Sequence, residues 1–393
     1  MSESYEDPEA RYSYRSALVD GLRAAGSLQL GRLRLLLPAK FGFCWGVDRA
    51  LAMVQDARES FPGRPLWLLN SIIHNPRVNS DMDAIGIGFL KGPLSRAGAL
   101  DRLGPQDVVI VPAFSAEVEE MQLLRERQVE IVDTTCPWVI KPHKRALKYI
   151  REGFTIIIHG TVGHDETRAT CSLVRHHNGQ FVVVHDLEET ETLARYLEGG
   201  LDAECLRAGL NSCAVAENFE PAEHLRRIGL INQTTMLASE SRAVAARLRQ
   251  ALVVRDGEDS MEQLFRDFDT ICGATQENQD AATSVVVDDP DLFLVVGGFD
   301  SSNTKNLARV GDGRNVPTFH IEGPESIEDE RLWHRDRDSG EILEIGGWLP
   351  AEGPVVVAFT AGASTPDAIL GQVIERVVEL AGEQLPREIA FAG

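Results

Sequence analysis

The sequence predicts an α/β protein in which parallel sheets are covered by helices. Short apolar runs alternate with helix-like segments, as in LRLLLPA before VDRALAMVQDARESF and FTIIIHG before DETRATCSLV. Such alternation of strand and helix is typical of parallel sheets. The 393 residues exceed one compact core, and about 150 residues per domain indicates two to three domains.

The same pattern continues along the chain. Further strand and helix pairs are expected in DVVIVPAFSAEVEEMQLLRER, VEIVDTTCPWVIKPHKRALKYIRE, DLFLVVGGFDSSNTKNLARV and PVVVAFTAGASTPDAILGQVIERVVELAG. Three cysteines each follow a short apolar run and precede helix-like sequence, which hints at a pseudo-threefold organisation. Residues 1–30 are expected to form a polar extension with a short helix. The charge-rich segments 187–225 and 322–343 fit a solvated periphery, and we assign them no chemistry.

Composition and charge exclude several classes of protein. No apolar stretch approaches the roughly 18 residues of a membrane span. The acidic N-terminus lacks the basic start and apolar block of a secretory signal, so we expect a cytoplasmic protein. The net charge of -21 argues against nucleic-acid binding, which requires cations at the phosphates. Six cysteines without a C-x-x-C pair favour reduced thiols over a disulfide framework or a zinc ribbon.

Three cysteines mark the candidate reaction centre. Cys44, Cys136 and Cys272 occur in FGFCWGVDRAL, VDTTCPWVIK and DTICGATQENQD. Three thiolates from distant loops can hold an iron-sulfur cluster that keeps one iron free of protein ligands, because such clusters normally have four cysteines. The alternative is an ordinary buried cysteine, which is our interpretation of Cys171.

Polar side chains follow several predicted strands, at the edge where ligands gather in parallel sheets. His164 and Glu166 in GTVGHDETRAT suit an anion-binding group and a proton donor, although H-x-E also fits a helix cap. His74 in IIHNP can donate to phosphate or be a hydrogen-bonded bystander. Thr234 in INQTTML has a hydroxyl suited to orienting an alcohol.

Two strand ends suggest phosphate binding by neutral donors. Ser301, Ser302 and Asn303 lie between a strand and a helix, where free N–H groups favour anions. Ser364 and Thr365, in ASTPD, precede Pro366 and Asp367 and match a helix cap followed by proline. Each segment has a purely structural interpretation as a cap, but two of them on successive strand and helix units indicate a shared ligand.

Eight segments of the chain resemble, in the same order, the motifs of the 4-hydroxy-3-methylbut-2-enyl diphosphate reductase family. They are FGFCWGVDRA, IIHN, DTTCP, GHDET, NQTT, DTICGATQ, SSN and TAGAS. The resemblance extends from about residue 34 to about residue 372. PAFSAEVEEM, DTTCPWV and DTICGATQ resemble the longer plant and cyanobacterial branch. The short bacterial form has a histidine in an S-A-H-G segment where this chain has FSAEVEE, and we assign Glu117 no diphosphate role because carboxylates repel anions.

The resemblance implies three α/β domains in a trefoil around a central 4Fe-4S cluster bound by Cys44, Cys136 and Cys272. The implied domains are 45–135, 136–268 and 269–385, and the strand at 31–44 joins the last. Glu166 would deliver protons and Thr234 would orient the substrate hydroxyl. The diphosphate or its surroundings would be held by His74, His164, Ser301, Ser302, Asn303 and Ser364.

The implied reaction removes the hydroxyl of an allylic diphosphate reductively, giving isopentenyl and dimethylallyl diphosphate in the non-mevalonate isoprenoid route. The sequence has no G-x-G-x-x-G fingerprint of a dinucleotide site after a strand, so we expect electrons from a ferredoxin or flavodoxin. The segment KPHKRALKYIRE is a candidate docking site for this carrier. The main alternative is a hydro-lyase that uses an open cluster iron without net electron transfer. An iron-sulfur sensor and a metal-free phosphate-binding protein are further alternatives. Oligomeric state and product ratio do not follow from the sequence.

Overall fold

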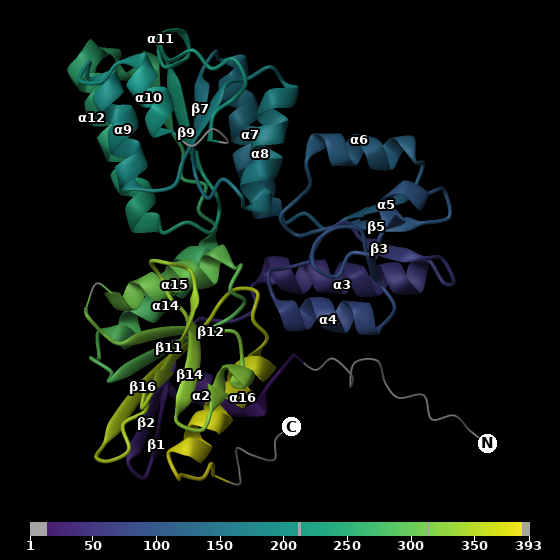
Figure 1. The fold of residues 1–393 in the computed structure, drawn as a ribbon, viewed down its shortest axis with the longest axis vertical. Helices are drawn as coiled ribbons and strands as arrows, with labels where there is room; N and C mark the ends of the chain where they lie inside the picture. The colour runs from purple at the N-terminus through teal and green to yellow at the C-terminus, as the bar shows by residue number, and fades with distance from the viewer. Residues whose placement is uncertain (1–13, 211–213, 313, 387–393) are drawn as a thin grey trace. The chain divides into compact units, whose positions relative to one another are not determined.

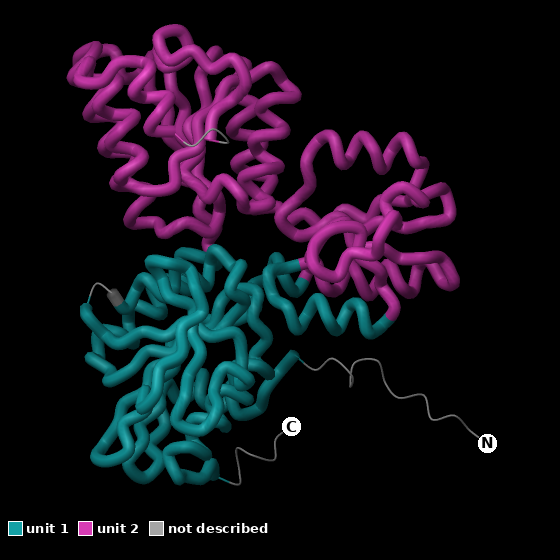
Figure 2. Tube along the Cα trace, viewed as in Figure 1, with its two compact units in different colours: residues 1–48, 73–85, 274–393 teal, residues 49–72, 86–273 magenta. Residues whose placement is uncertain are grey.

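The computed structural model describes residues 14–210, 214–312 and 314–386 (Figure 1). These residues form three β-sheets with helices on their faces. Figure 2 shows two compact units, of which unit 1 comprises residues 1–48, 73–85 and 274–393, and unit 2 comprises residues 49–72 and 86–273. The predicted α/β class with three α/β modules is confirmed, while the predicted domain boundaries and the trefoil arrangement remain predictions.

Unit 1 contains one mixed sheet in the order β1-β2-β16-β11-β12-β14-β13, with β15 on β14. The central strands pair in parallel and the two edges are antiparallel. The strands are β1 (Ser27–Leu30), β2 (Leu33–Leu36), β11 (Leu292–Val296), β12 (Thr318–Ile321), β13 (Ile327–Glu328), β14 (Arg331–Arg335), β15 (Ile342–Gly346) and β16 (Val355–Ala361). The charge-rich segment 322–343 thus supplies short strands of an antiparallel edge.

Helices cover both faces of this sheet. Alternate residues of β11 enter two separate cores, since Leu294 belongs to a cluster with α2 and α16, and Phe293 to one with α14 and α15. Such burial on both faces explains why β11 is an uninterrupted apolar run. The helices of unit 1 are α2 (Ala17–Ala25), α4 (Pro76–Ala84), α14 (Gly273–Val286), α15 (Ser302–Asp312) and α16 (Asp367–Leu380).

The first sheet of unit 2 has the order β4-β3-β5-β6 and is parallel throughout. Its strands are β3 (Leu66–Leu68), β4 (Gly88–Phe89), β5 (Val108–Val111) and β6 (Glu130–Asp133), and its neighbouring helices are α3 (Trp45–Ser60), α5 (Ala99–Arg102) and α6 (Val118–Glu126). β5 is buried along its whole length, as expected for a central strand of a parallel sheet.

The second sheet of unit 2, β10-β9-β7-β8, is also parallel. Its strands are β7 (Thr155–His159), β8 (Phe181–Val184), β9 (Ile228–Asn232) and β10 (Phe265–Asp267). Helices α7 (Pro137–Arg151) and α8 (Asp165–His176) pack on one face. The other face is covered by α9 (Leu187–Leu197), α10 (Ala203–Gly209), α12 (Ala238–Asp256) and α13 (Met261–Leu264), with the short α11 (Pro221–His224) before β9. Within the segment 187–225, helices α9 and α10 therefore bury their inner residues in this core and carry charged residues on their outer faces.

In the described part of the chain, no helix is both long enough and apolar enough to span a bilayer.

One glycine allows α7 to pack closely on the sheet. A Cβ added at Gly229 of β9 would come within 2.5 Å of the Tyr149 ring of α7. Tyr149 is one of the largest fully buried side chains, so it has little room to move. The absence of a side chain at Gly229 therefore sets the packing of α7 on β9.

We predict that Gly229→Ala lowers the free energy of unfolding by about 1–3 kcal/mol, the usual cost of overpacking a filled core. Thermal and urea unfolding followed by circular dichroism measure the change. Gly346→Ala is the matched control, because a Cβ there meets nothing within 4 Å. Equal stability of the two variants would show that Tyr149 is not tightly held.

Candidate active site

The centre of the site in unit 2 is a buried pair formed by Glu166 and Thr234. Glu166 lies in the first turn of α8, after β7, and Thr234 follows β9. Because β7 and β9 are adjacent and parallel, the loops after them meet at the same sheet edge. The Thr234 backbone N–H donates to Glu166 Oε1 at 2.7 Å, and the Thr234 hydroxyl donates to Oε2 at 2.8 Å.

This environment changes the acidity of Glu166. Burial disfavours the carboxylate and raises the pKa of Glu166 to about 7, although the two hydrogen bonds from Thr234 act in the opposite direction. At neutral pH the side chain therefore exists in both protonation states. A carboxyl group with this pKa can donate a proton and take one back, as a general acid requires.

The loop before Glu166 is held by two neighbours. His164 caps α8, since its Nδ1 accepts a hydrogen bond from the Glu166 backbone N–H at 3.2 Å. Gln233 Oε1 accepts from the Thr161 N–H at 2.9 Å and from the Thr167 hydroxyl at 3.0 Å. The capping alternative for His164 is thus confirmed, and its role toward a diphosphate remains a prediction.

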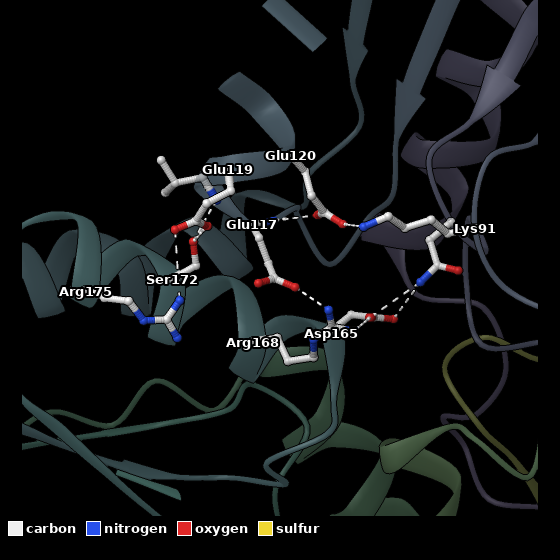
Figure 3. A network of polar contacts seen from close by, with 10 residues as sticks. Lys91, Glu117, Glu119, Glu120, Asp165, Arg168, Ser172 and Arg175 are labelled. Carbon is white, nitrogen blue, oxygen red and sulfur yellow. Dashed lines mark hydrogen bonds and ion pairs between the residues drawn. The ribbon is translucent and has the colours of Figure 1, made fainter. Parts of the chain in front are cut away.

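A network of ion pairs and hydrogen bonds connects α6 to α8 (Figure 3). Glu117 pairs with Arg168 of α8, and Lys91 pairs with Glu120 of α6. Ser172 of α8 donates to Glu119 Oε2 at 2.5 Å, and its hydroxyl accepts from the Val118 N–H at 2.8 Å. The Glu117 carboxylate is therefore part of an ion pair that holds α8 in place.

Each of the two cysteines in unit 2 is tied by its backbone to a neighbouring loop. Cys272 donates its N–H to Thr234 O at 3.0 Å, which places it beside the acid pair. Cys136, the residue before α7, donates to Ala113 O at 2.8 Å. Neither cysteine forms a disulfide, and both are partly exposed.

Unit 1 brings together Ser301, Ser302, Asn303 and Ser364, which we call the serine-asparagine cluster. They follow β11 and β16, which are adjacent and parallel. Ser364 Oγ lies 3.5 Å from Ser301 Oγ and donates to His74 O at 3.2 Å. All four cluster residues are buried polar residues, which is unusual for side chains of this type.

Two further contacts join Cys44 and His74 to the serine-asparagine cluster. Cys44 donates its N–H to Ala363 O at 3.3 Å, and the Ala363 N–H donates to Asn303 Oδ1 at 2.8 Å. A Cβ at Gly298 would lie 2.4 Å from His74 O, so only glycine allows the loop after β11 to approach His74 this closely. Burial lowers the pKa of His74 to about 4, which keeps its imidazole neutral.

The side chain of Asn303 is incompletely satisfied. Its Nδ2 is buried and finds no hydrogen-bond partner among the described residues. A buried donor without a partner costs free energy that a bound acceptor can recover. The serine-asparagine cluster therefore has the chemistry of a site for an anion bound by neutral donors.

One prediction about helix caps is wrong. Neither Ser364 nor Thr365 caps α16, whose N-cap residue is Pro366 without a side-chain hydrogen bond. Instead, the Ser364 hydroxyl donates to His74 O at 3.2 Å, and the Thr365 hydroxyl donates to Val296 O at 3.1 Å. Ser301 does act as a cap, since its Oγ accepts from the Thr304 N–H at 3.2 Å.

The predicted sulfur trio is divided between the two units, with Cys44 in unit 1 and the other two cysteines in unit 2. Within residues 14–210, 214–312 and 314–386, no three His, Cys, Asp or Glu side chains are grouped to hold a metal ion. The common site of Cys44, Cys136 and Cys272 therefore stays a prediction.

Sequence reasoning did not predict three of the supporting contacts. They are the Gln233 contacts to the loop before α8, the ion pair between Glu117 and Arg168, and the hydrogen bonds at 3.4 Å from Asn70 Nδ2 to Asp165. Each joins residues more than fifty positions apart in charged or polar segments. A single sequence contains no signal for such pairs.

Comparison with known proteins identifies the family. The LytB protein family model matches residues 35–378. A 4-hydroxy-3-methylbut-2-enyl diphosphate reductase of Gloeobacter violaceus is 42% identical over 381 residues, covering 95% of this chain and 89% of the relative. The enzyme of the same name from a Nostoc species is 41% identical, covering 93% of this chain and 90% of the relative.

Two solved structures are similar to this chain. One, described as (E)-4-hydroxy-3-methyl-but-2-enyl diphosphate reductase, the terminal enzyme of the non-mevalonate pathway, has a TM-score of 0.52 at 25% identity and covers 88% of this chain and 99% of its own. The E-1-hydroxy-2-methyl-but-2-enyl-4-diphosphate reductase of Plasmodium falciparum has a TM-score of 0.64 at 20% identity, with coverages of 88% and 87%, and supports the fold alone. This chain belongs to the LytB family, whose members include these cyanobacterial 4-hydroxy-3-methylbut-2-enyl diphosphate reductases, as its ordered motifs predicted.

Proposed function

We propose that the protein reductively removes the hydroxyl group of 4-hydroxy-3-methylbut-2-enyl diphosphate, giving isopentenyl and dimethylallyl diphosphate. The observation that supports this most directly is the buried Glu166 and Thr234 pair, a proton donor with a pKa of about 7 and a hydroxyl beside it. Relatives with this activity cover almost the whole chain. The reaction consumes two electrons and two protons per substrate and releases one water.

A 4Fe-4S cluster is the proposed cofactor, with Cys44, Cys136 and Cys272 as its ligands. The donor set fits, because these three cysteines form no disulfide, are partly exposed, and immediately precede α3, α7 and α14. Cys171 differs, since it is buried in α8 and burial raises the pKa of its thiol to about 12. When bound, such a cluster supplies electron transfer and Lewis acidity at the iron without a protein ligand.

The protons come from Glu166 in this proposal. In its protonated form, Glu166 can donate from Oε2 to the Thr234 hydroxyl, which then passes its own proton toward the substrate oxygen. Departure as water is far easier than departure as hydroxide, so protonation of the leaving group lowers the barrier. Thr234 also orients the substrate hydroxyl through the same oxygen atom.

The diphosphate is assigned to the serine-asparagine cluster together with His74 and His164. Neutral hydroxyl, amide and imidazole groups bind an anion without relying on the overall field, which is repulsive at a net charge of -21. The unpartnered Nδ2 of Asn303 supports this assignment. The buried hydroxyls supply further donors of the kind that a phosphate accepts.

A ferredoxin or flavodoxin is the proposed electron donor, because the chain has no nucleotide fingerprint of its own. We also propose a cytoplasmic location, which suits the lack of disulfides among the five described cysteines.

The ligand assignment predicts that Cys44→Ser, Cys136→Ser and Cys272→Ser each lose most of the bound iron and sulfide. Anaerobic purification followed by iron and sulfide analysis and visible absorption measures the loss. Cys205→Ser is the control, because Cys205 is exposed and lies outside the trio. A normal iron content in any of the three variants would exclude that residue as a ligand.

For Glu166→Gln, we predict that kcat falls by about 10²–10⁴-fold, the usual contribution of a general acid. The fold is expected to persist, because the amide oxygen can accept from the Thr234 N–H while the amide nitrogen donates to the hydroxyl. Iron content and the melting temperature serve as controls, as does Glu126→Gln on the exposed face of α6. Near-normal turnover would exclude Glu166 as the proton donor.

The pKa of Glu166 predicts the pH dependence. The active form is protonated, so kcat/KM is expected to fall as the pH rises through about 7. Thr234→Val removes a donor that favours the carboxylate, so it should move this fall to higher pH and lower the rate. Thr234→Ser keeps the hydroxyl and should keep the profile. Identical profiles for the valine variant and the native protein would contradict the pairing.

A further inference from the structure

Helix α7 presents a row of basic side chains on one face. Lys141, Lys144, Arg145, Lys148 and Arg151 are spaced at three and four residues, so they lie on the same side of the helix. The opposite side is buried through Val139, Pro142, Ala146 and Tyr149. The chain has only six lysines in total, and three of them belong to this helix.

These side chains form an open groove of about 680 Å³ together with Pro137 and Trp138. Trp138 is 42% exposed, which is unusual for so large an apolar side chain. The Lys141 ammonium lies 5.1 Å from the centres of both the Trp138 and Phe268 rings, and the Arg145 guanidinium lies 3.5 Å from that of Phe268. Two of the five cations are therefore held in place by aromatic rings.

Nearby carboxylates neutralise little of this charge. Lys148 has Glu152 at 3.7 Å, and Asp267 is near enough for its charge to act on Tyr149. Among the described residues, no carboxylate lies within 4 Å of the charged groups of Lys141, Lys144, Arg145 or Arg151. The electrostatic potential at this basic patch is therefore positive, although the chain as a whole has a net charge of -21.

The patch begins directly after one of the proposed cluster ligands. Cys136 is the N-cap residue of α7, and Pro137 and Trp138 follow it at the near end of the groove. At 1.5 Å per residue, Lys144 lies only about 12 Å farther along the helix axis than Cys136. A partner seated on this face would be close to the Cys136 thiol.

We propose that this face of α7 is the docking surface for an acidic protein that carries one electron at a time. The inference rests on the proposed function, in which each allylic alcohol takes up two electrons and two protons and yields one alkene and one water. Two successive encounters with a reduced one-electron carrier supply the electrons, and each encounter leaves one carrier oxidised. The basic side chains would select an acidic carrier and orient it toward Cys136.

Other anionic partners fit this face less well. A nucleic acid would meet five cations on one short helix and strong repulsion from the remaining surface. A lipid bilayer would require apolar side chains to insert, but the apolar face of α7 is packed against β7 and β9. Exposed Trp138 beside cations is instead typical of a protein contact.

The test compares two triple charge reversals that change the net charge equally. Lys144→Glu, Lys148→Glu and Arg151→Glu reverse the exposed part of the patch. Arg125→Glu, Arg195→Glu and Arg242→Glu reverse exposed arginines on α6, α9 and α12. The probe is a purified acidic ferredoxin, whose binding is measured by surface plasmon resonance between 20 and 200 mM NaCl.

We expect the patch variant to bind the ferredoxin at least 10-fold more weakly than the native protein, mostly through a slower association rate. The control variant should lose less than 3-fold. Native binding should weaken as salt rises, because local attraction is screened. Equal loss in both variants, or tighter binding at high salt, would overturn the docking surface. Native binding to phosphatidylglycerol vesicles or single-stranded DNA that the patch variant loses would also overturn it.

Turnover separates this inference from the proposed function. With a small reduced dye such as methyl viologen, both variants should match the native rate, while the ferredoxin-supported rate falls only in the patch variant. If the native protein with its cluster fails to convert the diphosphate with either reductant, the proposed function fails. If the native protein is active and the patch variant keeps its ferredoxin-supported rate, only the docking surface fails.

Discussion

Parallel pairing of neighbouring strands is the constraint on which the candidate site depends. Because β7 and β9 run side by side in the same direction, the loops after them meet, and Glu166 reaches Thr234 across 68 positions of the chain. The same rule brings the loop after β11 to the loop after β16, where Ser301 meets Ser364. For either pair of residues to meet, each strand has only to be buried and to end in a polar turn.

The acid at the centre of unit 2 is an unfavourable arrangement that the surrounding structure maintains. A buried carboxylate lacks the hydration that stabilises it in water, and the two hydrogen bonds from Thr234 replace only part of that stabilisation. The cap by His164, the contacts of Gln233 and the ion pairs between α6 and α8 prevent the loop from moving Glu166 into solvent. The loop is therefore held by contacts that surround the acid on several sides.

The sequence predicted the alternation of strands and helices well, because period and burial are local properties. The apolar runs at β5, β7, β11 and β16 are strands, and the polar segments after them hold the candidate residues. Antiparallel β13, β14 and β15 were not predicted, since their charges resemble those of a solvated loop. The direction of the Ser364 hydroxyl and the partner of Glu117 depend on distant backbone, so local pattern could not indicate them.

The path of the chain through the two units has a consequence for the gene. The polypeptide passes from one unit to the other after residues 48, 72, 85 and 273, so neither unit is encoded by one uninterrupted stretch. Any continuous fragment that contains one whole unit also contains residues of the other unit, so neither unit can be produced alone as one continuous fragment. A single crossover with a related coding sequence, at any internal point, therefore leaves unit 1 with parts from both parents.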